Sequence, residues 1–185
     1  MTKTFLAGIV VLGLAAPAFA GQQPTTAAKA DKTTAYGKMS DETFMTKAAL
    51  AGMAEVDLGK LAVEKAANDE VKKFGQRMVD DHSKAVEDLK TLAQNKHVTL
   101  PTAIDPHETA LRDRLAKLSG PEFDRAYMQA MMSDHRRALN EFRMEAKMGK
   151  DADVKGWASK TLPTIEEHVK LAQNTTRAVG TTGKR

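Results

Sequence analysis

Apolar residues recur at helical spacing in four long segments of the chain and in one short one. The long segments cover residues 41–66, 69–95, 121–148 and 152–179, and the short one covers residues 106–118. Each long segment carries an apolar stripe that repeats every three or four residues, which is the period of a helix with one buried face. No alternating run typical of a strand separates them, so the pattern predicts an all-α fold.

Residues that start and stop helices lie at the ends of these segments. Ser40 and Asn68 precede acidic residues, Pro121 lies near a helix start, Gly149 follows a helix end, and Asp151 precedes the last segment. The turns near Asn68 and Lys150 are short, so each pair of long helices is expected to form an antiparallel hairpin. Together the hairpins predict a four-helix bundle, with the short helix as an external crossover between its second and third long helices.

The four stripes predict the core. In chain order they are Phe44, Ala48, Gly52, Val56, Gly59, Ala62 and Val63; then Val71, Phe74, Met78, Ala85, Leu89 and Leu92; then Phe123, Tyr127, Met131, Ala138, Phe142 and Ala146; then Val154, Trp157, Ala158, Leu162, Ile165, Val169 and Ala172. Gly52 and Gly59 lie within the first stripe, where glycine lowers helicity but lets another helix approach closely. A close helix contact is therefore expected there.

The first twenty residues have the pattern of a secretory signal peptide. Lys3 precedes an apolar run over residues 5–14, and small residues lead up to Ala20. We expect cleavage after Ala20 and an exported, periplasmic protein without a transmembrane segment, because the run is too short to span a bilayer. Residues 21–39 read as a disordered linker, residues 40–179 as the folded domain, and residues 180–185 as a disordered tail.

Composition narrows the classes of function. The chain contains no cysteine, so it has neither a disulfide framework nor a cysteine nucleophile. Its 28 basic and 24 acidic residues are interspersed rather than gathered into a basic stripe, which argues against nucleic-acid binding. Because neither a phosphate-binding glycine loop nor a serine triad is indicated, binding is favoured over catalysis. No pattern identifies a protein partner.

Three histidines, His82, His135 and His168, lie near the middle of three long segments and on their apolar stripes. Counted from the first hairpin turn at Asn68, Glu55 and His82 lie at nearly the same depth. Counted from the second, His135 and His168 differ by about 4.5 Å, at 1.5 Å per residue. A buried histidine needs partners for its ring nitrogens. The spacing predicts that these four side chains converge as candidate metal ligands.

Two interpretations of this cluster remain open, and three further residues belong to both: Asp81, Tyr127 and Asp134. In the first, these residues orient ligands of a transition metal ion, with zinc or copper favoured over iron by the predominance of imidazole. In the second, they satisfy the histidine rings without any ion, as a buried hydrogen-bond network that fixes the register of the helices.

Three blocks carry a resemblance to a known family: AGMAEVDLGKLAVEKAANDEVKKFGQRMVDDHSKA, PEFDRAYMQAMMSDHRRAL and LPTIEEHVKLAQ. Over residues 40–176 the chain resembles the exported bacterial domain-of-unknown-function family 4142 (DUF4142), which is grouped with ferritin-like four-helix bundles. The resemblance implies that fold and no settled activity. Ferritin-like di-metal proteins carry Glu-x-x-His pairs. In this chain Val79, Met132 and Ile165 stand three residues before the histidines, which favours a single ion.

The sequence thus predicts an exported protein that binds or buffers a transition metal in a histidine and carboxylate site. One alternative is a metal-dependent redox enzyme at the same site, acting on peroxide or on metal ions. The other is a metal-free envelope or stress-related interaction module.

Overall fold

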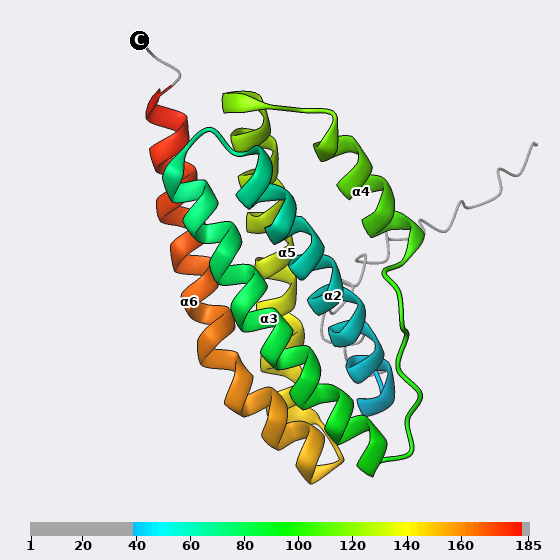
Figure 1. Ribbon diagram of the computed structural model, residues 1–185. Helices are drawn as coiled ribbons and strands as arrows, with labels where there is room; N and C mark the ends of the chain where they lie inside the picture. The colour runs from blue at the N-terminus through cyan, green and yellow to red at the C-terminus, as the bar shows by residue number, and fades with distance from the viewer. Residues whose placement is uncertain (1–38, 183–185) are drawn as a thin grey trace, which may run out of the picture. The chain divides into compact units, whose positions relative to one another are not determined.

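The computed structural model describes residues 39–182 of the 185-residue chain (Figure 1). Within this range it consists of five helices without a strand: α2 (Asp41–Lys65), α3 (Asp69–Asn95), α4 (Pro106–Ala116), α5 (Gly120–Met148) and α6 (Ala152–Thr182). The all-α prediction is confirmed. None of these helices combines the length and apolar character that a membrane span requires. The predicted signal peptide and nearly all of the predicted linker lie outside the described residues.

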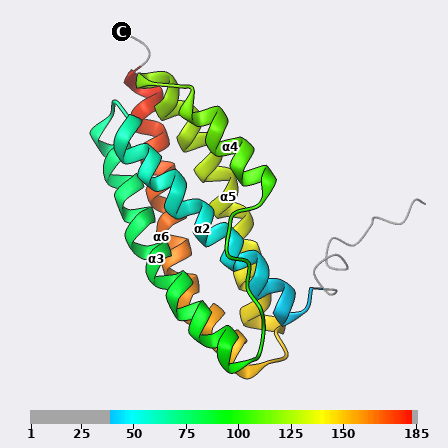
Figure 2. The same ribbon diagram turned by 45° about the vertical axis from the view of Figure 1, so that its right-hand side comes forward.

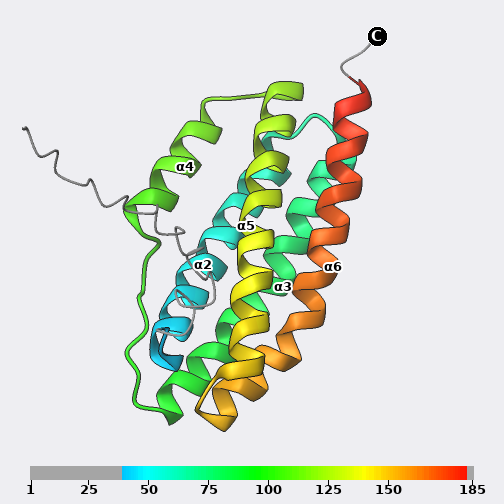
Figure 3. The same cartoon turned by 180° about the vertical axis from the view of Figure 1, so that it is seen from behind.

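The long helices form two hairpins that pack against each other (Figures 1 and 2). One hairpin is α2 with α3, and the other is α5 with α6. Between the hairpins, α3 contacts α6 and α2 contacts α5. Seen from behind, the short helix α4 lies outside the long helices, beside α2 and α5 (Figure 3). The interior is therefore bounded on four sides by long helices.

Most of the helices begin at the capping residues that the sequence indicates. The side chain of Ser40 accepts a hydrogen bond from the backbone N–H of Thr43, and that of Asn68 accepts one from Glu70. Asp105 caps α4 in the same way, with Pro106 as the first helical residue. Each of these bonds satisfies one of the N–H groups that a helix leaves unpaired at its start.

Each hairpin turn is fastened by a carboxylate from the other hairpin. Asp124 of α5 accepts hydrogen bonds of 3.0 and 2.9 Å from the backbone N–H groups of residues 67 and 68. Asp41 of α2 accepts bonds of 3.1 and 2.7 Å from the N–H groups of residues 150 and 151. Hydrogen bonds to a charged acceptor are stronger than neutral ones. These contacts fix how far each hairpin extends along the other, and so set the depth of residues counted from the turns.

The helices α2 and α3 approach closely at glycines. A Cβ atom on Gly59 would lie 2.6 Å from the carbonyl oxygen of Gly75, and one on Gly75 would lie 2.8 Å from the Cβ of Ala62. A Cβ on Gly52 would lie 2.6 Å from Cγ2 of Val86. The close helix contact predicted from Gly52 and Gly59 is confirmed.

The predicted core stripes are wrong in places. Val63 is 40% exposed, whereas Met45 and Leu58, which the stripe of α2 omitted, are buried. The reason is that α2 contacts α3, α4 and α5, so that more than one narrow face is covered. The last helix also continues to Thr182, beyond the predicted end at Val179, while α4 stops at Ala116 rather than at residue 118.

Two clusters of buried apolar side chains fill the interior. One includes Phe74, Leu115 and Tyr127, and the other includes Phe44 and Phe142. The three histidines lie between these two apolar clusters and form a polar layer in the interior.

Candidate metal site

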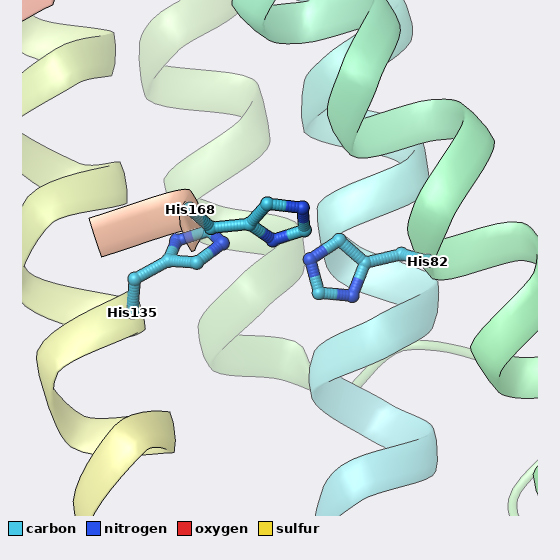
Figure 4. A group of neighbouring side chains, drawn as sticks. All are labelled: His82, His135 and His168. Atoms are coloured by element: carbon cyan, nitrogen blue, oxygen red, sulfur yellow. The ribbon is translucent and has the colours of Figure 1, made fainter. Parts of the chain in front are cut away.

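Helices α3, α5 and α6 each place one histidine in the polar layer, so that the rings of His82, His135 and His168 lie side by side (Figure 4). One ring nitrogen of each histidine lies within 4.8 Å of those of the other two. The ring centroids are 5.2–5.6 Å apart. The side chains are 9, 1 and 0% exposed in chain order. The structure therefore brings the three histidines together inside the protein.

Hydrogen bonds orient two of the rings. Nδ1 of His135 lies 2.9 Å from the carbonyl oxygen of Met131, and Nε2 of His168 lies 2.8 Å from Oδ2 of Asp81. Because a carbonyl and a carboxylate only accept hydrogen bonds, both nitrogens carry a proton and donate it. Their other nitrogens, Nε2 of His135 and Nδ1 of His168, are left with lone pairs.

These two lone-pair nitrogens are buried and have no hydrogen-bond partner among the described residues, and the same holds for Nε2 of His82. Each histidine thus keeps one nitrogen unpaired in the interior. A ring whose outer N–H is held by a carboxylate or carbonyl, while its inner nitrogen is free, has the arrangement that metal-binding histidines adopt.

Electrostatics keep the three rings neutral. Burial lowers the pKa of His82 well below its ordinary value, and the charges of His135 and His168 lower it further. Burial, aided by the charge of His168, lowers the pKa of His135 to about 4. Burial also lowers the pKa of His168, although Asp81 offsets part of the effect. Neutral imidazole is the form that coordinates metal ions, and burial favours that form in all three rings.

Asp81 is the carboxylate that holds His168. Its Oδ2 accepts hydrogen bonds from both His168 and Nε of Arg77. Burial acts to raise the pKa of Asp81, but these two hydrogen bonds outweigh it and lower the pKa. Arg77 also lies 3.4 Å from Glu167 at the surface. A charged chain of contacts therefore connects the surface to the outer edge of the His168 ring.

Glu55 lies beside the histidines rather than within their group. Its Oε1 is 3.6 Å from Nδ1 of His135, the nitrogen that already bonds Met131, and its Oε2 has no partner among the described residues. Burial raises the pKa of Glu55 well above its ordinary value, and the charges of Asp134 and Glu108 add to this. The group of three side chains with mutually close ligand atoms contains only histidines.

Tyr127 and Asp134, the other two predicted neighbours, contact different groups. The Tyr127 hydroxyl is buried without a hydrogen-bond partner among the described residues, and burial together with the charge of Glu55 raises its pKa well above the ordinary value. Asp134 pairs with Arg137 at 2.9 Å, and burial raises its pKa although Arg137 opposes the effect. Neither side chain orients a histidine ring as Asp81 does.

The sequence reading missed two contacts of the site, the Met131 carbonyl and Arg77. Each had a signal in the sequence. Met131 stands four residues before His135 and Arg77 four residues before Asp81, which is the spacing at which helical residues lie one turn apart.

Comparison with known proteins places the chain in a family. The model of the family "Domain of unknown function (DUF4142)" matches residues 23–175, so the chain belongs to that family. A crystal structure of a DUF305 protein from Streptomyces coelicolor is similar, with a TM-score of 0.63 and 15% identity, over 76% of this chain and 94% of that one. At that identity the likeness concerns the fold alone. No curated protein matches the chain.

Proposed function

We propose that this protein binds or buffers a single transition metal ion through His82, His135 and His168, inside a ferritin-like antiparallel four-helix bundle. One observation carries the proposal: each ring keeps one buried nitrogen that has no partner among the described residues. An unpaired buried polar atom costs about 1–3 kcal/mol. One ion bound to all three nitrogens removes that cost at three positions together.

A metal-free hydrogen-bond network fits these rings less well. His135 and His168 use their N–H groups on Met131 and Asp81, so their inner nitrogens are both acceptors. Only His82 still has a proton available for the cluster. A single proton pairs one of the two acceptors and leaves the other unsatisfied, whereas a cation attracts all three lone pairs.

Zinc and copper suit the donor set better than iron. Three imidazoles form a borderline-soft shell, which both ions accept. A carboxylate-bridged pair of irons lacks support, because Val79, Met132 and Ile165 occupy the positions where Glu-x-x-His motifs carry glutamate. A tetrahedral zinc ion with bonds of about 2.0–2.1 Å holds its nitrogens about 3.3–3.4 Å apart. The present separations of up to 4.8 Å mean that binding draws the rings inward by about 1 Å or more.

The remaining predicted residues support the three ligands in different ways. Asp81 orients His168 and increases the basicity of its inner nitrogen. Glu55, predicted as a fourth ligand, lies beside His135 at 3.6 Å, and we place it next to the three ligands. Tyr127 and Asp134 belong to the surroundings of Glu55, since both interact with it electrostatically.

Export to the periplasm is part of the same proposal. It rests on the signal-peptide pattern of residues 1–20, and the solved DUF305 protein is itself named as a secreted one. Outside the cytoplasm a cysteine-free histidine site binds zinc or copper without risk of thiol oxidation, which suits a buffer in an oxidising compartment.

Metal stoichiometry tests the proposal. Purified protein is stripped of metal, dialysed against Zn²⁺ or Cu²⁺ and analysed for metal content. The expected result is one ion per chain in the wild type and none in His82→Ala. The variant would hold the ion with only two protein ligands instead of three. His107→Ala serves as the matched control, since that side chain is 79% exposed. Equal metal content in wild type and His82→Ala contradicts the assignment.

A further inference from the structure

A cavity of about 50 Å³ adjoins the histidine cluster. His82 and His135 of the cluster line it, together with Glu55. Apolar side chains such as Val86, Leu89 and Ala138 form most of the walls. One water molecule needs about 10–15 Å³ by the same measure, so the space admits a molecule of a few heavy atoms.

The cavity exists because α2 contributes small residues at this level. The three histidines come from α3, α5 and α6, which leaves α2 as the one long helix without a ligand. At the cavity α2 presents Ala48, Ala51 and Gly52. The backbone of α2 at Gly52 lies so close to Val86 of α3 that a Cβ atom would clash, which excludes a larger residue there. The side of the site opposite the three histidines is therefore open rather than filled.

Charged residues at the surface also line the cavity. Lys47 of α2 and Arg137 of α5 both line it, and each side chain is 51% exposed. Lys47 pairs with Glu141 across the two helices at 3.5 Å. Because these two lining side chains are half exposed, the cavity lies next to solvent at this point.

We propose that this cavity gives small donor molecules, neutral or singly charged and of up to about three heavy atoms, access to an exchangeable fourth position on the bound ion. The inference rests on the proposed metal site. Three protein ligands leave one tetrahedral position vacant, as in sites where zinc or copper takes an external ligand. Glu55 lines the cavity together with His82 and His135, and we assign its carboxyl group to hydrogen bond to the molecule that enters. The apolar walls and the small volume exclude larger or strongly hydrated ligands.

Azide binding to the Co²⁺-loaded protein tests this inference, because the visible spectrum of Co²⁺ reports changes in its coordination shell. Azide has three heavy atoms and fits the cavity. Titration should give a saturable spectral change in the wild type. Ala138→Leu, which fills the cavity one turn after His135, should weaken azide binding about tenfold or more while Co²⁺ uptake stays unchanged. Ala130→Leu is the matched control, on the same helix and similarly half-buried but packed in the other apolar cluster.

The outcomes separate this inference from the proposed function. Absence of Co²⁺ uptake by the wild type overturns both. Normal Co²⁺ uptake without an azide response overturns only the exchangeable fourth position and leaves the proposed metal site standing. A response that appears in Glu55→Gln but not in the wild type assigns the fourth position to Glu55 itself and also overturns the inference. If Ala138→Leu fails to fold, as judged by its far-UV circular dichroism, Ala85→Leu replaces it from the opposite wall.

Discussion

Two buried polar clusters lie at different levels of the helical domain. The three histidines lie midway along it, while Glu145 and Asp41 lie together beside the turn between α5 and α6. Both clusters contain atoms without a hydrogen-bond partner among the described residues, namely Oε1 of Glu145 and one nitrogen of each histidine. The side chain of Glu145 is 4% exposed, so its burial is comparable to that of the histidines.

The clusters differ in how their unpaired atoms are satisfied. Burial raises the pKa of Glu145 to about 7, aided by the neighbouring Asp41 and Asp151, so the protonated form of the Glu145 carboxyl group is favoured. In the histidine cluster burial also favours the neutral form, but a neutral imidazole has lost a proton, which leaves lone pairs. A proton on Glu145 makes this carboxyl group neutral and able to donate a hydrogen bond. The inner nitrogens of the three histidines have at most one proton among them, and the proposed metal ion would satisfy all three.

The largest expected effect is stabilisation of the histidine cluster by metal. At a free metal concentration 1,000 times the dissociation constant, the free energy of unfolding should rise by about 4.1 kcal/mol, since the ion binds only the folded state. Urea denaturation with and without Zn²⁺ or Cu²⁺ measures it. His82→Ala should abolish the increase and His107→Ala should keep it. A wild type that responds to none of several metals would favour the metal-free network.

The carboxyl cluster should respond to pH instead of metal. The folded-state pKa of Glu145, about 7, lies above its ordinary value of 4.5, so the protonated form stabilises the fold. That contribution is fully present below pH 4.5 and is lost as pH rises through 7. Relative to Glu145→Gln, which mimics the protonated carboxyl, the wild type should lose about 2–3 kcal/mol of stability between pH 4.5 and pH 8.

Denaturation curves of both proteins at several pH values provide the measurement for Glu145. Glu64→Gln, at an exposed position of α2, is the control and should run parallel to the wild type. Parallel curves for the wild type and Glu145→Gln would mean that Glu145 titrates normally, and the contrast between the two clusters would then disappear.

Asp81→Asn should weaken metal binding without abolishing it. Loss of the carboxylate that holds a ligand histidine typically lowers affinity 10–100-fold, and Asp81 bonds His168 at 2.8 Å. Competition with a coloured chelator gives the dissociation constants. The neighbouring Asp80→Asn is the control, because Asp80 is exposed and bonds Gln76. An affinity as high as that of the wild type would show that Asp81 has only a structural role.

Tyr127→Phe should have the smallest effect. The hydroxyl is buried without a partner, so its removal costs little and can raise stability by up to about 1 kcal/mol. Metal affinity should stay within about twofold of the wild type, because Tyr127 contacts none of the three inner nitrogens. Isothermal titration calorimetry measures the affinity, and a loss of tenfold or more would place the hydroxyl in the coordination shell.

Most of the helical layout could be predicted from the sequence, because apolar periodicity and capping residues are local properties. Ser40 and Asn68 both cap helices where expected. Burial was less predictable, since it depends on neighbours. Val63 lies on the predicted stripe of α2 yet is exposed, while Leu58 is covered.

The meeting of the three histidines followed from counting residues to the hairpin turns. That count works because Asp41 and Asp124 fasten each turn to the other hairpin. The orientation of the rings could not be counted in this way. It depends on side-chain rotamers, which place Glu55 at Nδ1 of His135 and Asp81 at Nε2 of His168. The cavity beside them arises from small residues on several helices and has no local signal in the chain.

Anomalous diffraction from crystals grown with Zn²⁺ tests the central claim most directly, because it locates the ion relative to individual nitrogens. The predicted result is one strong peak per chain, about 2.0–2.1 Å from Nε2 of His82, Nε2 of His135 and Nδ1 of His168. An interior without a peak, in crystals that bind zinc only at surface side chains, would contradict the assignment of these three histidines as a metal site.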